Sequence, residues 1–365
     1  MIRAEIDHCQ GRIPFRRFME LALYTPELGY YMNELRKFGA EGDFITAPEI
    51  SPLFSRCVAR QCAQILRGCN DATILEFGAG SGAMAADVLL ELEQSDMLPQ
   101  RYAILELSAA LRDRQRATLH ARAAHLLPCV QWLERLPTAP IEGVILANEV
   151  LDAMPVHRVR LTSSGVTEQY VTWGQDRFIW TEGPLSDPAL YPRISALPVD
   201  LPENYSTEIN LAAAAWTSSL APLLQHGTLL LFDYGFPAHE FYHPQRSDGT
   251  LVCHYRHRVH NDPLTLVGLQ DITSHIDFTA LAQAAHDSGL QVAGFTSQTL
   301  FLLAMGIDQM TDAHAADAAR WQIAQQIQKL TSPAEMGELF KALALTKNVE
   351  MQLQGFSLRD QRGRL

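Results

Sequence analysis

The sequence lacks several features that would assign it to a specialised class of protein. Its six cysteines include no C-x-x-C pair and no regular spacing, a pattern typical of free thiols in a reducing compartment. No apolar run reaches the roughly 18 residues that a membrane-spanning helix needs. The N-terminus shows neither a secretory signal nor a transit-peptide pattern. We therefore expect a cytoplasmic protein that does not contact a membrane.

Positive charge is also scarce. The chain has 29 Lys and Arg against 41 Asp and Glu, which gives a net charge of −12 at pH 7. A broad nucleic-acid surface needs clustered Lys and Arg, so we expect no nucleic-acid partner. With 365 residues, 47% of them hydrophobic and 19% charged, the chain has the composition of a globular protein. This length predicts either two domains or one core with additions.

What the sequence does contain is a glycine-rich turn, TILEFGAGSG, at 73–82. A short apolar run leads into Gly78, Gly80 and Gly82, and a helical stretch follows directly. Such a turn lets the polar groups of a ligand lie against bare backbone N–H groups. Gly78, Gly80 and Ala83 satisfy the dinucleotide fingerprint, which would indicate a nicotinamide cofactor. Glu76, two residues before the first glycine, is instead typical of S-adenosylmethionine (SAM) methyltransferases, so both cofactors remain open from the turn alone.

Two further strand ends carry polar side chains. Glu106 ends an expected strand at 102–107, where a carboxylate can accept both ribose hydroxyls of either cofactor. Asn148, Glu149 and Asp152 follow an apolar strand at 144–147. The carboxyl ends of parallel strands face the ligand crevice, so these groups would meet a methyl acceptor there. A guanidinium acceptor needs carboxylates that bind it through two hydrogen bonds. The alternative to this binding role is that Asn148 or Asp152 only caps the start of a helix.

Alternating strands and helices with short connections predict an α/β fold with a doubly wound parallel sheet. A helix is expected at 52–66, capped by Ser51, and three short strands between 156 and 183 break the alternation. Beyond them we expect helices at 208–224, 277–288, 321–330 and 333–345, a strand at 228–232, and a closing strand pair at 290–295 and 299–304. The intervening stretch 236–276 reads as a long irregular segment, of the kind that often forms a lid.

Histidines are frequent in that segment. Cys253, His254, His257 and His260 have spacings that suggest a metal site, but two arginines lie between them and no Cys pair is present. We therefore expect no metal and assign these side chains to hydrogen bonding in a lid.

Taken together, several motifs resemble the MidA-like SAM-dependent methyltransferases, which include the mitochondrial complex I assembly methyltransferase and its bacterial relatives. The matching stretches are GDFITAPEIS (42–51), ILEFGAGSG (74–82), ANEVLDAMPVHR (147–158), LLLFDYG (229–235), GLQDITSHIDFTAL (268–281) and TLFLLAMGI (299–307). The resemblance implies a class I methyltransferase sheet of seven strands, the last one antiparallel. It divides the chain into a helical N-terminal cap with a cofactor-closing loop (1–70), a SAM-binding core (71–155 and 225–305), an inserted β-meander and helix (156–224), a lid-like segment (236–276) and C-terminal helices (306–365).

The resemblance also implies roles for individual residues. SAM would be held by Glu76, Gly78, Ala79, Gly80, Glu106 and Asn148, with Thr46, Pro48 and Glu49 closing over it. Glu149 would hold the methyl acceptor, with Asp152 and Asn148 beside it. For the mitochondrial member the family implies arginine methylation of a complex I subunit. This chain has Ala79 and Ser81 where that member has Pro and Arg, which fits a bacterial-type relative.

The sequence therefore predicts a SAM-dependent methyltransferase that acts on a protein substrate, with arginine as one acceptor and a homodimer left open. In-line transfer of the methyl group would depend mainly on proximity and orientation. Two alternatives stay open at this point. One is a nicotinamide-dependent oxidoreductase on the same type of core, and the other is an assembly chaperone that retains the SAM fold without using it.

Overall fold

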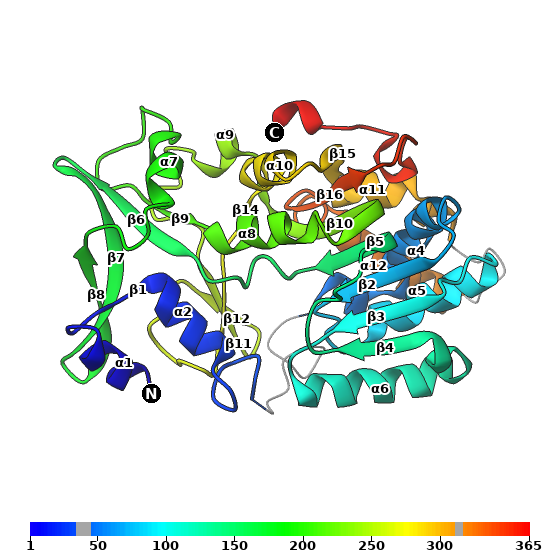
Figure 1. Ribbon diagram of the computed structural model, residues 1–365, viewed down its shortest axis with the longest axis horizontal. Helices are drawn as coiled ribbons and strands as arrows, with labels where there is room; N and C mark the ends of the chain where they lie inside the picture. The colour runs from blue at the N-terminus through cyan, green and yellow to red at the C-terminus, as the bar shows by residue number, and fades with distance from the viewer. Residues whose placement is uncertain (34–44, 311–316) are drawn as a thin grey trace.

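A computed structural model describes residues 1–33, 45–310 and 317–365. It is an α/β protein built on a mixed sheet of eight strands (Figure 1). Five adjacent strands pair in parallel along the main path, and they are β4 (Val130–Leu133), β3 (Arg101–Leu105), β2 (Ala72–Phe77), β5 (Ile141–Asn148) and β10 (Leu224–Phe236), in that spatial order. Next to β10 comes β16 (Phe340–Lys347), antiparallel to both β10 and β15 (Gln291–Ser297). The eighth strand, β14 (Ile276–Asp277), pairs with the end of β10 and was not expected.

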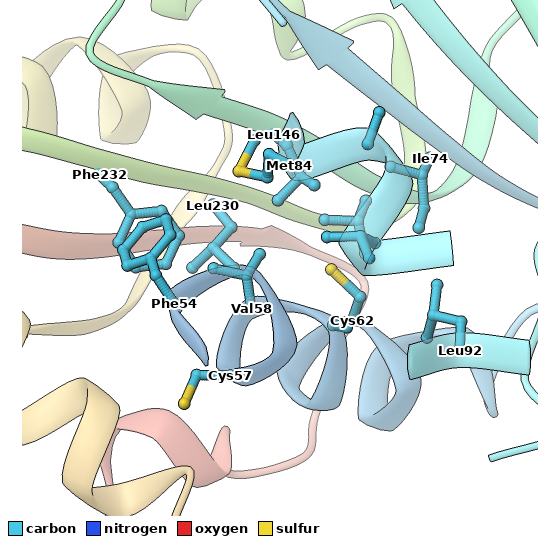
Figure 2. Packing of buried hydrophobic residues seen from close by; sticks show 14 of the residues in the cluster. Phe54, Cys57, Val58, Cys62, Ile74, Met84, Leu92, Leu146, Leu230 and Phe232 are labelled. Carbon is cyan, nitrogen blue, oxygen red and sulfur yellow. The ribbon is translucent and has the colours of Figure 1, made fainter. Parts of the chain in front are cut away.

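Helices cover both faces of this sheet, because its central strands are apolar on both sides. On one face, α4 (Pro52–Leu66), α5 (Ala83–Gln94), α6 (Ala109–Ala123), α11 (Gln298–Ala304) and α12 (Asp317–Thr331) pack in one buried cluster. On the other face lie α8 (Leu211–Leu220) and α10 (Phe278–Asp287). Figure 2 shows the first cluster, where Phe54 and Val58 of α4 meet Leu230 and Phe232 of β10. Leu229 and Leu231, between them in the sequence, belong to the opposite cluster.

Several expected helices form where the local signals placed them. Helix α4 begins at Pro52, and the Ser51 hydroxyl accepts a hydrogen bond from the Leu53 N–H at 3.3 Å, as a capping residue should. Helix α5 follows the glycine turn directly. In the N-terminal part of the chain, helix α2 (Phe15–Tyr24) begins directly after Pro14.

A second, smaller region lies beside the large sheet and contains the N-terminal residues (Figure 1). Its antiparallel sheet consists of β1 (Ile13–Pro14), β6 (His157–Thr162), β7 (Gly165–Gly174), β8 (Arg177–Gly183) and β9 (Ser206–Ile209). Phe15 and Phe18 of α2 pack with Val171 of β7 and with Leu251 and Ile272 of the segment at 236–276. The remaining helices of the described chain are α1 (Ile2–His8), α3 (Ala47–Ile50), α7 (Leu190–Ser195), α9 (Ala238–Phe241) and four short 3-10 turns.

The expectation of a long irregular segment at 236–276 is wrong. It contains α9 and a three-stranded sheet of β11 (Val252–Tyr255), β12 (Arg258–His260) and β13 (Asp271–Thr273). Strands β11 and β12 form a hairpin whose two turn residues, Arg256 and His257, have φ angles of 48° and 59°. Such a turn usually carries Asn or Gly, and neither residue occurs here, so no local pattern predicts the hairpin.

Three further expectations need correction. The helix expected at 208–224 is divided at Asn210, where β9 ends and the Asn210 side chain caps α8 by accepting from the Ala213 N–H at 2.8 Å. The strand expected at 299–304 is helix α11, whose apolar run at 300–304 has no periodicity that distinguishes a strand from a helix. The C-terminal part at 306–365 is not all helical, because the expected helix at 333–345 is replaced by β16. Its Ala- and Leu-rich sequence favours a helix locally, but burial on both faces of the sheet decides otherwise.

Candidate active site

A cavity of about 490 Å³ opens at the carboxyl ends of β2, β3 and β5, a size suited to a small-molecule cofactor. Strand ends, the glycine turn, α3 and the N-terminal region all contribute to it. Every residue that the sequence nominated lines this cavity, namely Thr46, Pro48, Glu49, Glu76, Gly78, Ala79, Gly80, Glu106, Asn148, Glu149 and Asp152. The structure thus brings together residues from four separate segments, while their individual roles stay predictions. The first three residues of the motif at 42–51 lie outside the described residues.

The glycine turn needs its glycines. Gly78, Gly80 and Gly82 all adopt left-handed backbone conformations, with φ angles of 61°, 53° and 83°. A Cβ atom on Gly82 would lie 3.0 Å from the Cα of Gln115 in α6. Gln115 in turn donates hydrogen bonds to the Gly80 carbonyl at 3.2 Å and to Glu106 Oε2 at 3.1 Å. One buried glutamine therefore joins the turn to the acid at the end of the next strand.

Two carboxylates on neighbouring strand ends are held in place for a ligand. Glu106 Oε1 accepts a hydrogen bond from the Ser108 N–H at 2.9 Å, and burial raises the pKa of this carboxyl. Glu76 accepts at Oε2 from the Tyr102 hydroxyl at 2.7 Å, whereas its Oε1 has no partner within the described chain. Burial raises the pKa of Glu76 to about 7. An unpartnered buried oxygen beside a side-chain-free turn is what a polar cofactor with hydroxyl and ammonium donors would fit.

The loop at 46–51 is attached to both halves of the cavity. In this loop Glu49 of α3 accepts a hydrogen bond from the Ser81 hydroxyl in the glycine turn. The backbone N–H of Ala47 donates to Glu149 Oε1 at 3.4 Å. The loop therefore spans from the glycine turn to the acid expected to hold the acceptor.

The acidic end of the cavity is the turn after β5. Glu149 has a φ angle of 53°, a conformation that a residue other than glycine seldom adopts without a stabilising reason. The reason lies next to it, because Asp233 Oδ2 at the end of β10 accepts hydrogen bonds from the N–H groups of Leu151 (3.0 Å) and Asp152 (3.3 Å). Asn148 Nδ2 donates to Glu149 Oε1 at 3.3 Å.

These acids are close enough to influence one another. Burial, reinforced by the charge of Asp152, raises the pKa of Glu149 to about 8, and burial raises that of Asp152 to about 6. The pKa of Asp233 is also raised, first by burial and then by Asp152 and Glu149. Among the described residues, no Lys, Arg or His forms an ion pair with Glu149, Asp152 or Asp233. A ligand that carries a positive charge would therefore be bound favourably at the acidic end of the cavity, where the described residues supply no cation.

Sequence reasoning did not identify every residue of the site. Asp233 follows an apolar strand in the run LLLFDYG, so the rule that found Glu149 could have found it. Tyr24, Tyr31 and Trp216 also line the cavity, and no pattern in the sequence distinguishes them from other aromatic residues. Within the described ranges, no three His, Cys, Asp or Glu side chains are arranged to hold a metal ion. No helix in the same part of the chain is long and apolar enough to cross a bilayer.

Comparison with known proteins identifies the class. The family described as "Putative S-adenosyl-L-methionine-dependent methyltransferase" matches residues 57–296, more than half of the chain. A COG1565 superfamily member from Burkholderia thailandensis, solved with bound S-adenosyl-homocysteine, is 42% identical with a TM-score of 0.95, covering 100% of this chain and 95% of that one. The chain belongs to this family of SAM-dependent methyltransferases.

Among named relatives, the chain is similar to the mitochondrial "Protein arginine methyltransferase NDUFAF7 homolog" of Drosophila melanogaster. The two are 29% identical over 378 residues, covering 93% of this chain and 82% of the relative. The corresponding protein of Bos taurus is also 29% identical, over 92% of this chain and 80% of its own length. These relatives confirm the MidA-like family that the motifs indicated.

SAM is the cofactor of this family, and the cavity fits it. The nicotinamide alternative is therefore wrong, because the chain belongs to a SAM-dependent methyltransferase family and a relative aligned over all of this chain holds the demethylated form of SAM. The degenerate dinucleotide fingerprint arose because both cofactors use a glycine turn after a buried strand.

Proposed function

We propose that this chain transfers the methyl group of SAM to an arginine side chain of a partner protein. The observation that carries the proposal is the acidic end of the cavity. Glu149 and Asp152 line it, and buried Asp233 accepts a hydrogen bond from the Asp152 N–H; none of the three forms an ion pair with a cation among the described residues. A guanidinium group stays charged at all physiological pH values and binds carboxylates through two parallel hydrogen bonds.

The other end of the cavity is proposed to hold SAM. Glu106 would accept the ribose hydroxyls, Glu76 would face the methionine end, and the backbone of Gly78 and Gly80 would approach the cofactor closely. The path of seven strands, in which β16 lies between β15 and β10 and is antiparallel to both, supports the class I arrangement of the sheet.

Bound SAM supplies an electrophilic methyl group on a positively charged sulfur. The residues of the chain orient the acceptor and manage its proton. Glu149 would hold two guanidinium N–H groups and so favour attack by the remaining nitrogen on the methyl carbon, whose bond to sulfur would break as the new N–C bond forms. The methylated guanidinium would then lose one proton, which Glu149 could accept from a nitrogen that it already holds. Asp152 would add negative charge behind Glu149, and Asp233 fixes the backbone that presents both. The loop at 46–51 would limit access of water, since it contacts both the glycine turn and Glu149.

Two relatives named as protein arginine methyltransferases support the choice of acceptor, at 29% identity. Ser81, one of the two positions where this chain departs from the mitochondrial turn, bonds to Glu49 and so has a structural role here. A protein substrate is part of the proposal, and a homodimer remains an expectation from the sequence.

The test is methyl transfer from radiolabelled SAM into proteins of a lysate from a strain that lacks the gene. The wild-type protein should label a specific band, and Glu149→Gln should lose at least 100-fold of this activity while still binding SAM. A matched control is Glu142→Gln, which neutralises an acid at the opposite end of β5. A chaperone role would be supported instead if Glu149→Gln abolished labelling but still complemented the deletion strain.

A further inference from the structure

Two stacked tyrosines form a wall of the cavity next to its acidic end. Tyr24 is the last residue of α2, and Tyr31 lies in the turns that follow this helix. Their ring centroids lie 5.6 Å apart with an angle of 20° between the planes. Both residues line the same cavity as Glu149 and Asp152. Burial raises the pKa of both tyrosines, and the charges of Asp271 and Asp152 raise it further, so the rings lie close to these acids.

Hydrogen bonds hold both rings in position. The Tyr24 hydroxyl donates to the carbonyl of Ala153 at 2.9 Å. The Tyr31 hydroxyl donates to Asp271 Oδ1 at 2.8 Å, although 240 positions separate the two residues. Each hydroxyl proton is therefore already used within the protein. What the pair offers to a ligand is its aromatic surface.

On this basis, which rests on the proposed function, we propose that Tyr24 and Tyr31 bind the methyl acceptor and select a flat guanidinium group over a compact ammonium group. A guanidinium is planar, weakly hydrated and stacks on aromatic faces. It can lie against the tyrosine pair while its N–H groups face Glu149. An ammonium group is strongly hydrated and gains less from a flat aromatic wall.

The same contacts give the segment at 236–276 a role in the site. Asp271 belongs to β13, and it reaches the acceptor end of the cavity through Tyr31. Asp271 is therefore a positioning residue for Tyr31. The acceptor end is assembled from the N-terminal region, the turn after β5 and this distant segment.

Binding of two small cations tests the proposal directly. Methylguanidinium and methylammonium are titrated by calorimetry into protein saturated with S-adenosyl-homocysteine. The wild-type protein should prefer methylguanidinium, and Tyr24→Leu and Tyr31→Leu should each weaken its binding by about tenfold, within the range of cation–π contacts. Affinity for S-adenosyl-homocysteine should change less than about twofold, because the tyrosine pair lies at the acceptor end.

Matched variants separate binding from folding. Tyr24→Phe and Tyr31→Phe retain the rings and should retain the preference, while Tyr191→Leu, at a position 61% exposed in α7, should bind as the wild type does. Equal binding of both cations by the wild-type protein would overturn the proposal, as would undiminished methylguanidinium binding by the Leu variants. Loss of the preference for methylguanidinium in both Phe variants would contradict the claim that the aromatic rings select the guanidinium.

A peptide assay distinguishes this proposal from the proposed function. If the wild-type protein prefers methylguanidinium but labels no arginine peptide or protein, the proposed function fails and the tyrosine site stands. If arginine is labelled and the Leu variants leave its KM unchanged, the tyrosine site fails and the proposed function stands. Asp271→Ala should raise the KM for the acceptor and leave that for SAM unchanged, and Tyr31→Phe, which loses the same hydrogen bond, should raise it similarly while keeping the preference for the guanidinium.

Discussion

Asp233 accepts a hydrogen bond from the backbone N–H of Leu151 across 3.0 Å, although the two residues are 82 positions apart in the sequence. The bond joins the ends of the neighbouring strands β10 and β5, which run parallel to each other. It holds the turn in which Glu149 adopts its left-handed conformation. A residue that need not touch a ligand thus determines where the proposed acceptor-binding acid lies.

Asp233→Ala should lower kcat for methyl transfer and leave the affinity for SAM within about twofold of the wild type. The substitution removes the acceptor of two buried N–H groups, which should destabilise the turn by about 1–3 kcal/mol. Steady-state kinetics with both substrates varied, together with thermal unfolding, measure the two effects. A variant with normal kcat would show that the turn keeps its shape without Asp233.

Glu106→Ala should reduce the affinity for S-adenosyl-homocysteine by about ten- to a hundredfold, since charge-assisted hydrogen bonds contribute about 1.5–3 kcal/mol each. The carboxylate is already oriented by Ser108 and Gln115, so little reorganisation accompanies binding. Calorimetric titration gives the dissociation constant. The exposed acid Glu93, changed to Ala, is the control and should leave it unchanged. Unchanged affinity in Glu106→Ala would place the ribose elsewhere.

Gly82→Ala should weaken cofactor binding because the added Cβ atom would contact Gln115, in addition to the strain of a left-handed backbone. Gly82 and Gly289 share a φ angle of 83°, but a Cβ atom on Gly82 meets the Gln115 backbone at 3.0 Å, whereas one on Gly289 meets nothing within 4 Å. Gly289→Ala should therefore cost only about 1 kcal/mol of stability from the left-handed backbone. The Gly82 variant should lose more, and it should also lose affinity for S-adenosyl-homocysteine. Equal losses of stability in the two variants, with normal cofactor affinity, would contradict a role for the contact with Gln115.

The activity should rise with pH because the proposed acceptor-binding form of Glu149 is the carboxylate. Its pKa of about 8 in the free protein lies above the ordinary carboxyl range, so most Glu149 is protonated at neutral pH. We expect kcat/KM for the acceptor to increase between about pH 6 and 9, with an apparent pKa near 8, because arginine itself does not titrate there.

Binding of a cation should favour the ionised form of Glu149 and so lower its pKa. The pKa seen in kcat should therefore lie below the pKa seen in kcat/KM. Binding should also release a proton near pH 7, which titrations in buffers of different ionisation enthalpy detect. A pH profile that is flat across this range would remove Glu149 from the acceptor step.

The strand-end acids and the glycine turn could be predicted because each depends on a local pattern. An apolar run followed by glycines or acids marks the carboxyl end of a buried strand, and parallel strands place those ends together. Glu76, Glu106 and Glu149 were found in this way. All three line one cavity, and their roles as binding residues stay predictions.

The rest of the site depends on contacts that no local pattern records. Tyr31 meets Asp271 only because the hairpin segment packs against the N-terminal region. Strand β16 was mistaken for a helix because its sequence favours helix while its neighbours in the sheet decide its structure. In each case the deciding partner is remote in the sequence.

The most direct test of the whole account is to identify the residue that receives the methyl group. Purified protein is incubated with labelled SAM and lysate from a strain that lacks the gene, and the labelled protein is digested and mapped by mass spectrometry. The account predicts methylarginine at a defined position, made by the wild type and by Glu142→Gln but not by Glu149→Gln. Methylation of another residue type, or methylarginine that persists at wild-type levels with Glu149→Gln, would contradict it.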